Sequence, residues 1–439
     1  MSSKWEKVPI ESICLGIFDG PHATPTKTSD GPVFLGISAL NSGQLDLSNT
    51  EHLSEDDFIK WTKRVVPQAG DIVFSYETRL GQVAVIPAGL RCCLGRRMAL
   101  MRVNPEKVMS DYLLYAYLSP EFQEVIRQRT VHGSTVDRIP LTEFGSFPIS
   151  VPPLDVQAKV VEILRAIDDR ITLLRETNAT LEAIAQALFK SWFVDFDPVR
   201  AEMEGRVSEG MDEATAALFP DGLEESELGA VPIGWRVRRL GDVSSYLSRG
   251  ISPKYLEDGG VLVLNQKCIR DFSVDYCKGR RHDSSQRKIE GRQIATGDVL
   301  VNSTGVGTLG RVAQVLSLPE AAVIVDSHIT IVRPGPNLSW HYLGQFMMRK
   351  QPEIEAMGEG STGQTELSRS KLAEVFVLVP PEHILAAFDS LVIPVKQRIS
   401  LNESRIQNMA KLRDVLLPRL ISGQLRILEA ESQIDALAA

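Results

Sequence analysis

Three glycines near residue 305 have the spacing of a phosphate-binding loop. Gly305, Gly307 and Gly310 lie in the segment NSTGVGTLGRVA and match the pattern G-x-G-x-x-G. In dinucleotide-binding proteins this pattern joins a strand to a helix, and the amino terminus of the helix holds the pyrophosphate. Here the next residues, RVAQVLSL, alternate and include β-branched types, which favours a strand. The residues after the glycines therefore favour a hairpin over a nucleotide site.

A second candidate chemistry is hydrolysis by Asp298, Ser303 and His328, which have the residue types of a catalytic triad. Asp298 lies in a Gly-Asp turn that recurs at Asp71 in the first half of the chain, where Met98 aligns with His328. The first half would then lack a catalytic residue, so we do not assign a hydrolytic site.

Other motifs give no enzyme class. The sequence has no G-x-x-x-x-G-K-[ST] loop of a standard ATPase, and its seven histidines show no H-E-x-x-H or H-x-x-x-H spacing for a metal. Five cysteines without a C-x-x-C pair indicate reduced thiols, not a disulfide framework or a zinc site. We therefore expect a recognition protein without catalytic residues, metal or cofactor of its own.

Length and composition indicate a globular protein of two or more domains. The chain has 439 residues, of which 43% are hydrophobic and 24% are charged. No apolar run approaches the ~20 residues needed to cross a bilayer, and the amino terminus has no apolar signal-peptide core. We expect a cytoplasmic protein with no membrane partner.

An internal repeat is the strongest signal in the sequence. GDIVFSYETRLGQVAVI, from Gly70, corresponds to GDVLVNSTGVGTLGRVAQV, from Gly297, and HGSTVDRIPLTEFGSFPISVPP corresponds to EGSTGQTELSRSKLAEVFVLVPP. Matching positions lie 227 to 230 residues apart. Each copy contains a Gly-Asp turn, a strand, a polar tip, a glycine and a second strand, which predicts a hairpin. The first copy keeps only Gly81, the counterpart of Gly310.

Each copy ends in a Pro-Pro pair that precedes a long segment with heptad spacing. The seam positions are Val160, Leu164, Ile167, Ile171, Leu174, Asn178, Leu181, Ala185, Leu188 and Trp192 in the first segment, and Phe388, Val392, Val395, Ile399, Asn402, Ile406, Met409, Arg413, Leu416 and Leu420 in the second. We expect the two helices to pair, although each could instead cover a sheet. Pro394 is expected to kink or delay the second helix.

Charge is distributed unevenly along the chain. The formal net charge is −8, and residues 200–229 alone carry −7 and many helix breakers, which predicts a connector with a short helix at 211–219. Residues 262–292 carry a local charge of +4. A basic segment on an acidic chain is compatible with phosphate binding, although it could also be a solvated face.

Several motifs resemble the specificity subunit of type I restriction-modification systems. They are VPIGWRVRRLGDV from residue 231, GDVLVNSTGVGTLGRVA from 297, GSTGQTELSRSKLAEVFVLVPP from 360, ALFKSWFVDFDPVRAEMEG from 187 and LLPRLISGQL from 416. The resemblance covers essentially the whole chain. One departure is SYETRLGQVAV in the first copy, which keeps little of the STGVGTLGR pattern.

The resemblance implies a mixed α/β fold with duplicated target recognition domains, each a mixed sheet with flanking helices, separated by two long antiparallel coiled-coil helices. We expect recognition domains at 1–153 and 231–381, helices at 154–196 and 382–425, an acidic connector at 197–230 and a tail at 426–439. The implied partners are double-stranded DNA with a split target, two methyltransferase subunits and restriction subunits. S-adenosylmethionine, ATP and Mg are expected on those subunits.

Comparison of the two copies also suggests roles for individual residues, since shared features should hold the scaffold and differing tips should read bases. Ser134 and Thr135 match Ser361 and Thr362, which we assign to DNA-backbone positioning or turn structure. The predicted base readers are Tyr76, Thr78, Arg79, Asn302, Thr304, Arg311 and Gln364. Ser303, which lies between two of them, is also expected to contact DNA. The predicted phosphate contacts are Lys278, Arg280, Arg281, Arg287 and Lys288.

An aromatic cluster at the end of the first helix contains Phe189, Trp192, Phe193 and Phe196. It could cap the helix pair or dock a methyltransferase. Two other functions stay open: a DNA-binding adaptor of another defence complex, and a stand-alone enzyme with an unrecognised site.

Overall fold

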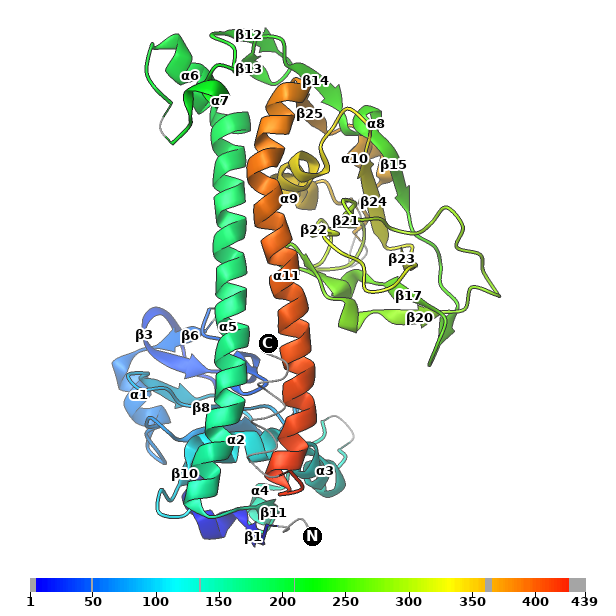
Figure 1. Ribbon diagram of the computed structural model, residues 1–439. Coiled ribbons are helices and arrows are strands. Elements are labelled where there is room, and N and C mark those ends of the chain that lie inside the picture. Colours follow the sequence, from blue (N-terminus) through cyan, green and yellow to red (C-terminus); the bar gives the residue numbers. More distant parts are fainter. Residues whose placement is uncertain (1–4, 49, 134–135, 209, 360–364, 426–439) are drawn as a thin grey trace. The chain divides into compact units, whose positions relative to one another are not determined.

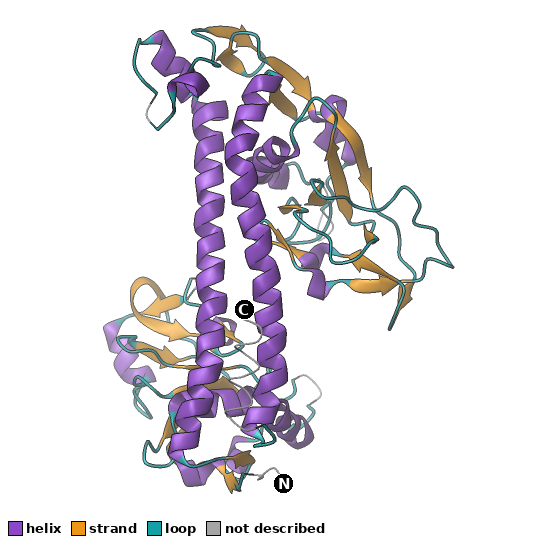
Figure 2. Ribbon diagram, in the orientation of Figure 1, coloured by secondary structure: helices purple, strands orange, loops and turns teal. Residues whose placement is uncertain are grey.

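A computed structural model describes residues 5–48, 50–133, 136–208, 210–359 and 365–425 of the chain (Figure 1). The chain forms two compact units. The first unit consists of two segments of the chain, one up to Leu173 and one from Ile406 onward. The second unit runs from Leu174 to Arg405. Each unit contains both strands and helices (Figure 2), which confirms the predicted mixed α/β class.

The first unit is built on a four-stranded sheet with strand order β2-β10-β7-β8. Its strands are β2 (Cys14–Asp19), β10 (Met98–Val103), β7 (Ile72–Ser75) and β8 (Val83–Val85). A second sheet has the order β6-β3-β9, with β3 and β9 parallel. Its strands are β6 (Glu51–Leu53), β3 (Lys27–Leu35) and β9 (Cys92–Leu94). Two short pairs join β1 (Lys7–Pro9) to β11 (Pro148–Ser150) and β4 (Leu40–Asn41) to β5 (Gln44–Leu45).

The second unit repeats the strand order of the main sheet, and its second sheet has one more strand, β16. Its main sheet has the order β15-β24-β21-β22, with β15 (Ser244–Arg249), β24 (Ile329–Pro334), β21 (Val299–Asn302) and β22 (Val312–Gln314). Its second sheet, β16-β20-β17-β23, again contains a parallel pair, β17 with β23. The strands are β16 (Tyr255–Leu256), β20 (Arg280–His282), β17 (Val261–Leu264) and β23 (Val323–Val325). The short pairs are β14 (Arg236–Arg239) with β25 (Phe376–Val379) and β18 (Ile269–Arg270) with β19 (Ser273–Val274).

Short helices flank the sheets of both units. The first unit has α1 (Glu55–Trp61), α2 (Ser110–Leu118), α3 (Pro120–Arg129) and α4 (Leu141–Phe144), and the second has α8 (Leu240–Val243), α9 (Trp340–Ala356) and α10 (Arg369–Ala373). The first copy has α2 and α3 where the second has the single helix α9. Ser119 explains the break, because it is extended before Pro120 and its side chain caps α3.

Part of the connector forms helices and strands. It contains α6 (Asp197–Met203), α7 (Glu213–Ala216) and a hairpin of β12 (Leu223–Ser226) and β13 (Gly229–Pro232). Helix α7 confirms the short helix expected at 211–219, and Asp212 caps it by accepting a hydrogen bond from the Thr215 amide. The sequence did not predict the β12–β13 hairpin.

Both long segments are helical. Helix α5 (Leu154–Lys190) ends in a π-helical turn, η3 (Ser191–Asp195), and α11 (Glu382–Ile421) begins directly after the second Pro-Pro pair. Pro394 lies inside α11, so it does not delay the helix, and the alternative expectation that it kinks the helix stays a prediction. Phe388 and Val392, six and two residues before Pro394, are fully buried, and this packing holds the first turns of α11 in place.

The two helices pair in an antiparallel way within each unit. In the first unit, Arg413 Nη1 of α11 lies 3.0 Å from Asp168 Oδ1 of α5. In the second unit, Asn402 Nδ2 donates to Asn178 Oδ1 at 2.8 Å, and Lys396 Nζ lies 2.6 Å from Glu182 Oε2. Partner numbers on α11 fall as those on α5 rise. The predicted pairing and the polar seam position are therefore confirmed.

Each unit has its own core beneath the main sheet, and one tyrosine occupies the same place in both. Tyr112 and Tyr342 are buried, and their hydroxyls donate to the carbonyls of Ser150 and Leu378, in β11 and β25. A buried hydroxyl needs such a partner, so each tyrosine ties the helix after the main sheet to the last strand of the repeat.

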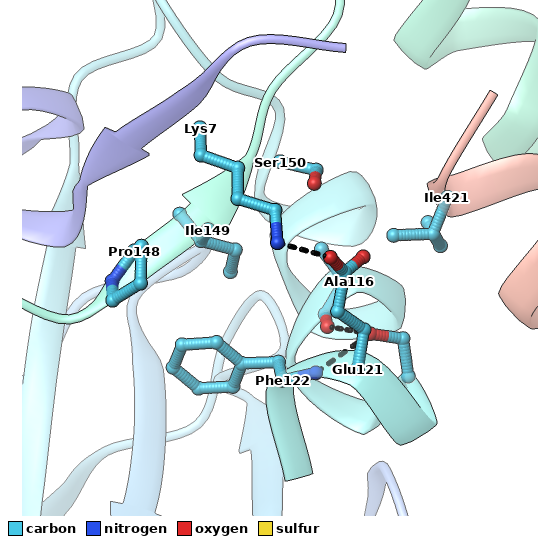
Figure 3. Close-up of a pocket in the computed structure, with 9 residues that line it drawn as sticks. Lys7, Ala116, Glu121, Phe122, Pro148, Ile149, Ser150 and Ile421 are labelled. Carbon is cyan, nitrogen blue, oxygen red and sulfur yellow. Dashed lines mark hydrogen bonds and ion pairs between the residues drawn. The ribbon is translucent and has the colours of Figure 1, made fainter. Parts of the chain in front are cut away.

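The first unit contains a small pocket next to its last strand. This pocket of about 10 Å³ lies beside β11 and is crossed by the ion pair of Lys7 with Glu121 (Figure 3). This volume admits about one water molecule and no organic ligand. Among the described residues no helix is long and apolar enough to cross a membrane.

We expect Lys396→Met to destabilise the second unit, because Lys396 is 2% exposed and its loss leaves the Glu182 carboxylate without its cation. Removing one partner of a buried pair costs about 3–5 kcal/mol. We expect the lower end, since Glu182 also accepts a hydrogen bond from Gln345. Urea unfolding measures the change.

The double variant Glu182→Leu/Lys396→Met should recover most of that loss, because both charges are then removed. Lys411→Met, at an exposed position of the same helix, is the matched control. A single variant as stable as this control would show that the buried ion pair is not needed.

Candidate functional site

A hairpin stands at the same place in both main sheets, as the sequence predicted. Strand β7 pairs with β8, and β21 pairs with β22. Strand β22 begins at Val312, so a strand and not a helix follows the three glycines. Gly81 and Gly310 have φ of +81° and +83°, and a Cβ at Gly310 would lie 2.7 Å from Glu355 Cα. The shared glycine is thus explained by backbone conformation and close packing.

A buried carboxylate fixes the start of each hairpin. Asp71 Oδ2 accepts hydrogen bonds from the Gln68 amide and from Arg102 Nη2, both at 2.8 Å. Asp298 Oδ2 accepts the equivalent bonds from the Ala295 amide and Arg333 Nη2, both at 2.7 Å. These side-chain hydrogen bonds raise the pKa of both arginines.

Asp298, Ser303 and His328 each bind a different partner and do not act as a catalytic triad. Asp298 is bound to Arg333, Ser303 Oγ lies 2.6 Å from Thr330 Oγ1, and His328 Nδ1 lies 2.8 Å from Thr304 Oγ1. These separate partners do not form a relay from carboxylate to imidazole to hydroxyl.

The tip of the second hairpin separates buried from accessible residues. Asn302 and Ser303 are fully buried, and Asn302 Nδ2 donates to the Gln266 carbonyl at 3.2 Å. This burial corrects the prediction that these two side chains contact DNA. Thr304 is half-buried, and Arg311 donates from Nη2 to the Gly307 carbonyl at 2.8 Å, with its side chain reaching solvent.

The tip of the first hairpin shows the same division. Tyr76 is 4% exposed and belongs to the core, and burial raises the pKa of its hydroxyl to about 12. The prediction that Tyr76 reads a base is corrected by this position. Thr78 and Arg79 are exposed, and Arg79 Nη1 donates to the Ile37 carbonyl at 3.0 Å.

The five predicted phosphate contacts lie on or beside β20, and we call them the basic segment: Lys278, Arg280, Arg281, Arg287 and Lys288. Their accessibility differs. Arg280 is exposed, and its guanidinium lies 3.4 Å from the centre of the Tyr255 ring. Arg281 instead pairs with Glu320 at 2.6 Å.

Two neighbouring residues join the basic segment to the second hairpin tip. Asn265 Nδ2 donates to the Lys278 carbonyl at 3.2 Å, and Gln266 Nε2 donates to the Thr304 carbonyl at 2.6 Å. The adjacent residues Asn265 and Gln266 therefore link the backbone at Lys278 to the backbone at Thr304.

The aromatic cluster is part of the core of the second unit. Phe189, Trp192, Phe193 and Phe196 are between 2% and 8% exposed. Phe193 contacts Trp235, Tyr342 and Phe388, with ring centres 4.9 to 5.7 Å apart. This burial favours the cap of the helix pair and does not offer these side chains as a docking patch. Ser134, Thr135, Ser361, Thr362 and Gln364 lie outside the described residues.

The alignment of the two repeats from sequence placed one residue wrongly and missed two equivalent arginines. The Tyr76 amide donates to the Arg97 carbonyl, just as the Ser303 amide donates to the His328 carbonyl. Arg97 is therefore the counterpart of His328, and not Met98. The arginines that bind Asp71 and Asp298 were also missed, because their spacing of 231 residues departs from that of the hairpins.

Comparison with known proteins agrees with this fold. The chain is 26% identical over 403 residues to the type I restriction enzyme MjaIX specificity subunit of Methanocaldococcus jannaschii, a match that covers 88% of this chain and 86% of that protein. It is 24% identical over 382 residues to the HindI specificity subunit of Haemophilus influenzae, covering 75% of this chain and 80% of the relative.

A solved structure and a family model add to these matches. The crystal structure of a type I restriction-modification S subunit from M. genitalium aligns with a TM-score of 0.51 and 15% identity, and covers 95% of this chain and 96% of that one, so the two share a fold. The model of the type I restriction modification DNA specificity domain matches residues 3–183. Over most of its length the chain is therefore similar to type I restriction-modification specificity subunits, and its first part matches their DNA specificity domain.

Proposed function

We propose that each repeat of this chain reads one half of a split DNA target. The observation that carries the proposal is that two units hold a hairpin on the same backbone frame while their tips differ. The buried pairs Asp71–Arg102 and Asp298–Arg333 are alike, whereas Glu77 and Thr304, each two residues after the first hairpin strand, differ in chemistry. A constant frame with variable tips suits recognition of two different sequences.

The charge of the second unit supports contact with a phosphate backbone. The basic segment lies on or beside β20 of the second sheet and is linked through Asn265 and Gln266 to the hairpin tip. A duplex held at the tip would have its phosphates within reach of this segment. Arginine and lysine contacts of this kind supply much of the affinity for DNA and make it salt-dependent.

We further propose that methylation and cleavage reside in partner chains. Two methyltransferase subunits and restriction subunits would bind S-adenosylmethionine, ATP and Mg, and the assembly would act in the cytoplasm. The names of the relatives support a subunit role, since each is a specificity subunit of a restriction enzyme. Among the described residues, no group of three His, Cys, Asp or Glu could hold a metal ion.

The helix pair is proposed to set the distance between the two parts of the target. Helix α5 has 37 residues and would be about 55 Å long at 1.5 Å per residue. One turn of DNA is about 34 Å, so a helix of this length can bridge half-sites on one face of a duplex.

Lengthening both helices by one heptad should lengthen the unspecified gap of the target. Seven residues inserted between Leu174 and Asn178, with seven between Asn402 and Ile406, keep the seam spacing and add about 10 Å. The gap should grow by about three base pairs while both half-sites stay unchanged. Sequencing of methylated bases in a host that expresses the variant with its methyltransferase measures the gap.

The matched control places the same seven residues after Gly205, an exposed connector residue with a left-handed backbone, and should leave the gap as it was. An unchanged gap in the heptad variant, with methylation retained, would contradict the role of the helices.

Arg280→Ala should weaken binding to all DNA sequences alike, because an exposed guanidinium beside the strand would contact phosphate and not a base edge. The slope of log affinity against log salt concentration should fall by about one. Arg281→Ala should have a smaller effect, since Glu320 already balances that charge. Titration of the assembled complex with labelled duplexes at several salt concentrations gives both slopes.

Arg206→Ala, in the acidic connector, removes one exposed arginine and serves as the control with no expected effect on the slope. A change in the preferred target sequence of the Arg280 variant would disprove the phosphate contact.

A further inference from the structure

Arg97 and His328 occupy the same backbone position in the two repeats. Each directly precedes the strand at the middle of the main sheet, β10 from Met98 and β24 from Ile329. The carbonyl of each accepts a hydrogen bond from the hairpin, at 3.2 Å from the Tyr76 amide and at 2.8 Å from the Ser303 amide. The backbone therefore brings residue 97 or 328 to the tip of its own hairpin.

The side chains of both residues contact equivalent tip positions with different chemistry. Glu77 and Thr304 each lie two residues after the first hairpin strand. Arg97 Nε lies 3.3 Å from Glu77 Oε2, and Arg97 Nη1 donates to Thr78 Oγ1 at 3.1 Å. A charged pair in the first copy thus stands where the second copy has Thr304 and His328.

The hydrogen bonds around Thr304 allow His328 to carry its proton on Nε2. Gln266 Nε2 donates to Thr304 Oγ1, so the Thr304 hydroxyl hydrogen is free to donate to His328 Nδ1 at 2.8 Å. In a neutral imidazole whose Nδ1 accepts, Nε2 carries the hydrogen. His328 then presents an N–H donor at its outer edge, and the residue is exposed.

Arg97 also presents donors to solvent. Its side chain is 31% exposed, and the two contacts described above use only Nε and Nη1. Both repeats therefore place a hydrogen-bond donor at the side of the hairpin tip. In the major groove, N7 of either purine and O6 of guanine are acceptors, and arginine can bind both guanine atoms at once.

We propose that Arg97 and His328 are specificity-determining residues, each reading a purine edge in a different half of the target. Thr304 and Gln266 are positioning residues that hold the His328 donor outward. This inference rests on the proposed function and goes beyond it by naming one equivalent base reader in each repeat.

The test measures binding of the assembled complex to duplexes in which each specified base pair of the target is replaced in turn. His328→Ala should lower discrimination at one base pair of one half-site by about 10- to 100-fold and leave the other half-site unchanged. Arg97→Asn should do the same in the other half-site. Asparagine is chosen because residue 97 has φ of +72°, which asparagine tolerates better than alanine. Arg97→Gly, which also tolerates this conformation, checks that the asparagine itself makes no new contact.

Positioning by Thr304 has its own readout. Thr304→Val removes the hydroxyl at similar volume and should lower discrimination at the base pair affected by His328→Ala, whereas Thr304→Ser should restore it. Arg96→Ala and Ser327→Ala, one residue before each proposed reader, are matched controls that should keep the target profile of the unmodified chain.

Uniform weakening over all duplexes, or loss at the same half-site for both variants, would overturn the assignment. If the unmodified complex prefers a two-part target and the variants show the same preference at every base pair, the assignment of Arg97 and His328 is wrong and the proposed function stands. If the unmodified complex has no two-part preference, the proposed function fails.

Discussion

A buried ion pair between the start of the hairpin and the middle strand of the main sheet is the interaction on which each repeat depends. Asp71 and Asp298 are 4% and 1% exposed at the side chain, and each binds an arginine and the amide of the preceding turn. Loss of one partner in such a pair is costly, because the other charge stays buried. The backbone at the start of each hairpin is therefore constrained. The tip residues, and the residue that precedes β10 or β24, differ between the repeats.

The long helices depend on a comparable constraint. In the second unit, polar contacts between the two helices join Asn178 to Asn402 and Glu182 to Lys396. A polar seam residue lowers stability relative to leucine but disfavours any shift of one helix along the other. The aromatic cluster then packs the end of α5 into the core of the second unit, where Phe193 contacts Phe388 of α11. Register within that unit is thus specified by side chains of both helices.

Much of the fold could be predicted from the sequence because its signals are periodic or repeated. The heptad spacing located both helices, and the paired Gly-Asp turns located both hairpins. Side-chain positions were harder, because burial depends on contacts distant in sequence. Asn302 is polar at a hairpin end and yet buried beneath Gln266. His328 was aligned one residue away from its true counterpart, Arg97, because spacing between the copies drifts along the chain.

Two equivalent hairpins that recognise different halves of one target are the central claim. Sequencing of methylated bases in host DNA, with this chain and its methyltransferase expressed together, tests it most directly. The account predicts chain-dependent methylation at a motif of two defined parts separated by a fixed number of unspecified base pairs. A single continuous motif, or methylation that is the same without the chain, would contradict it.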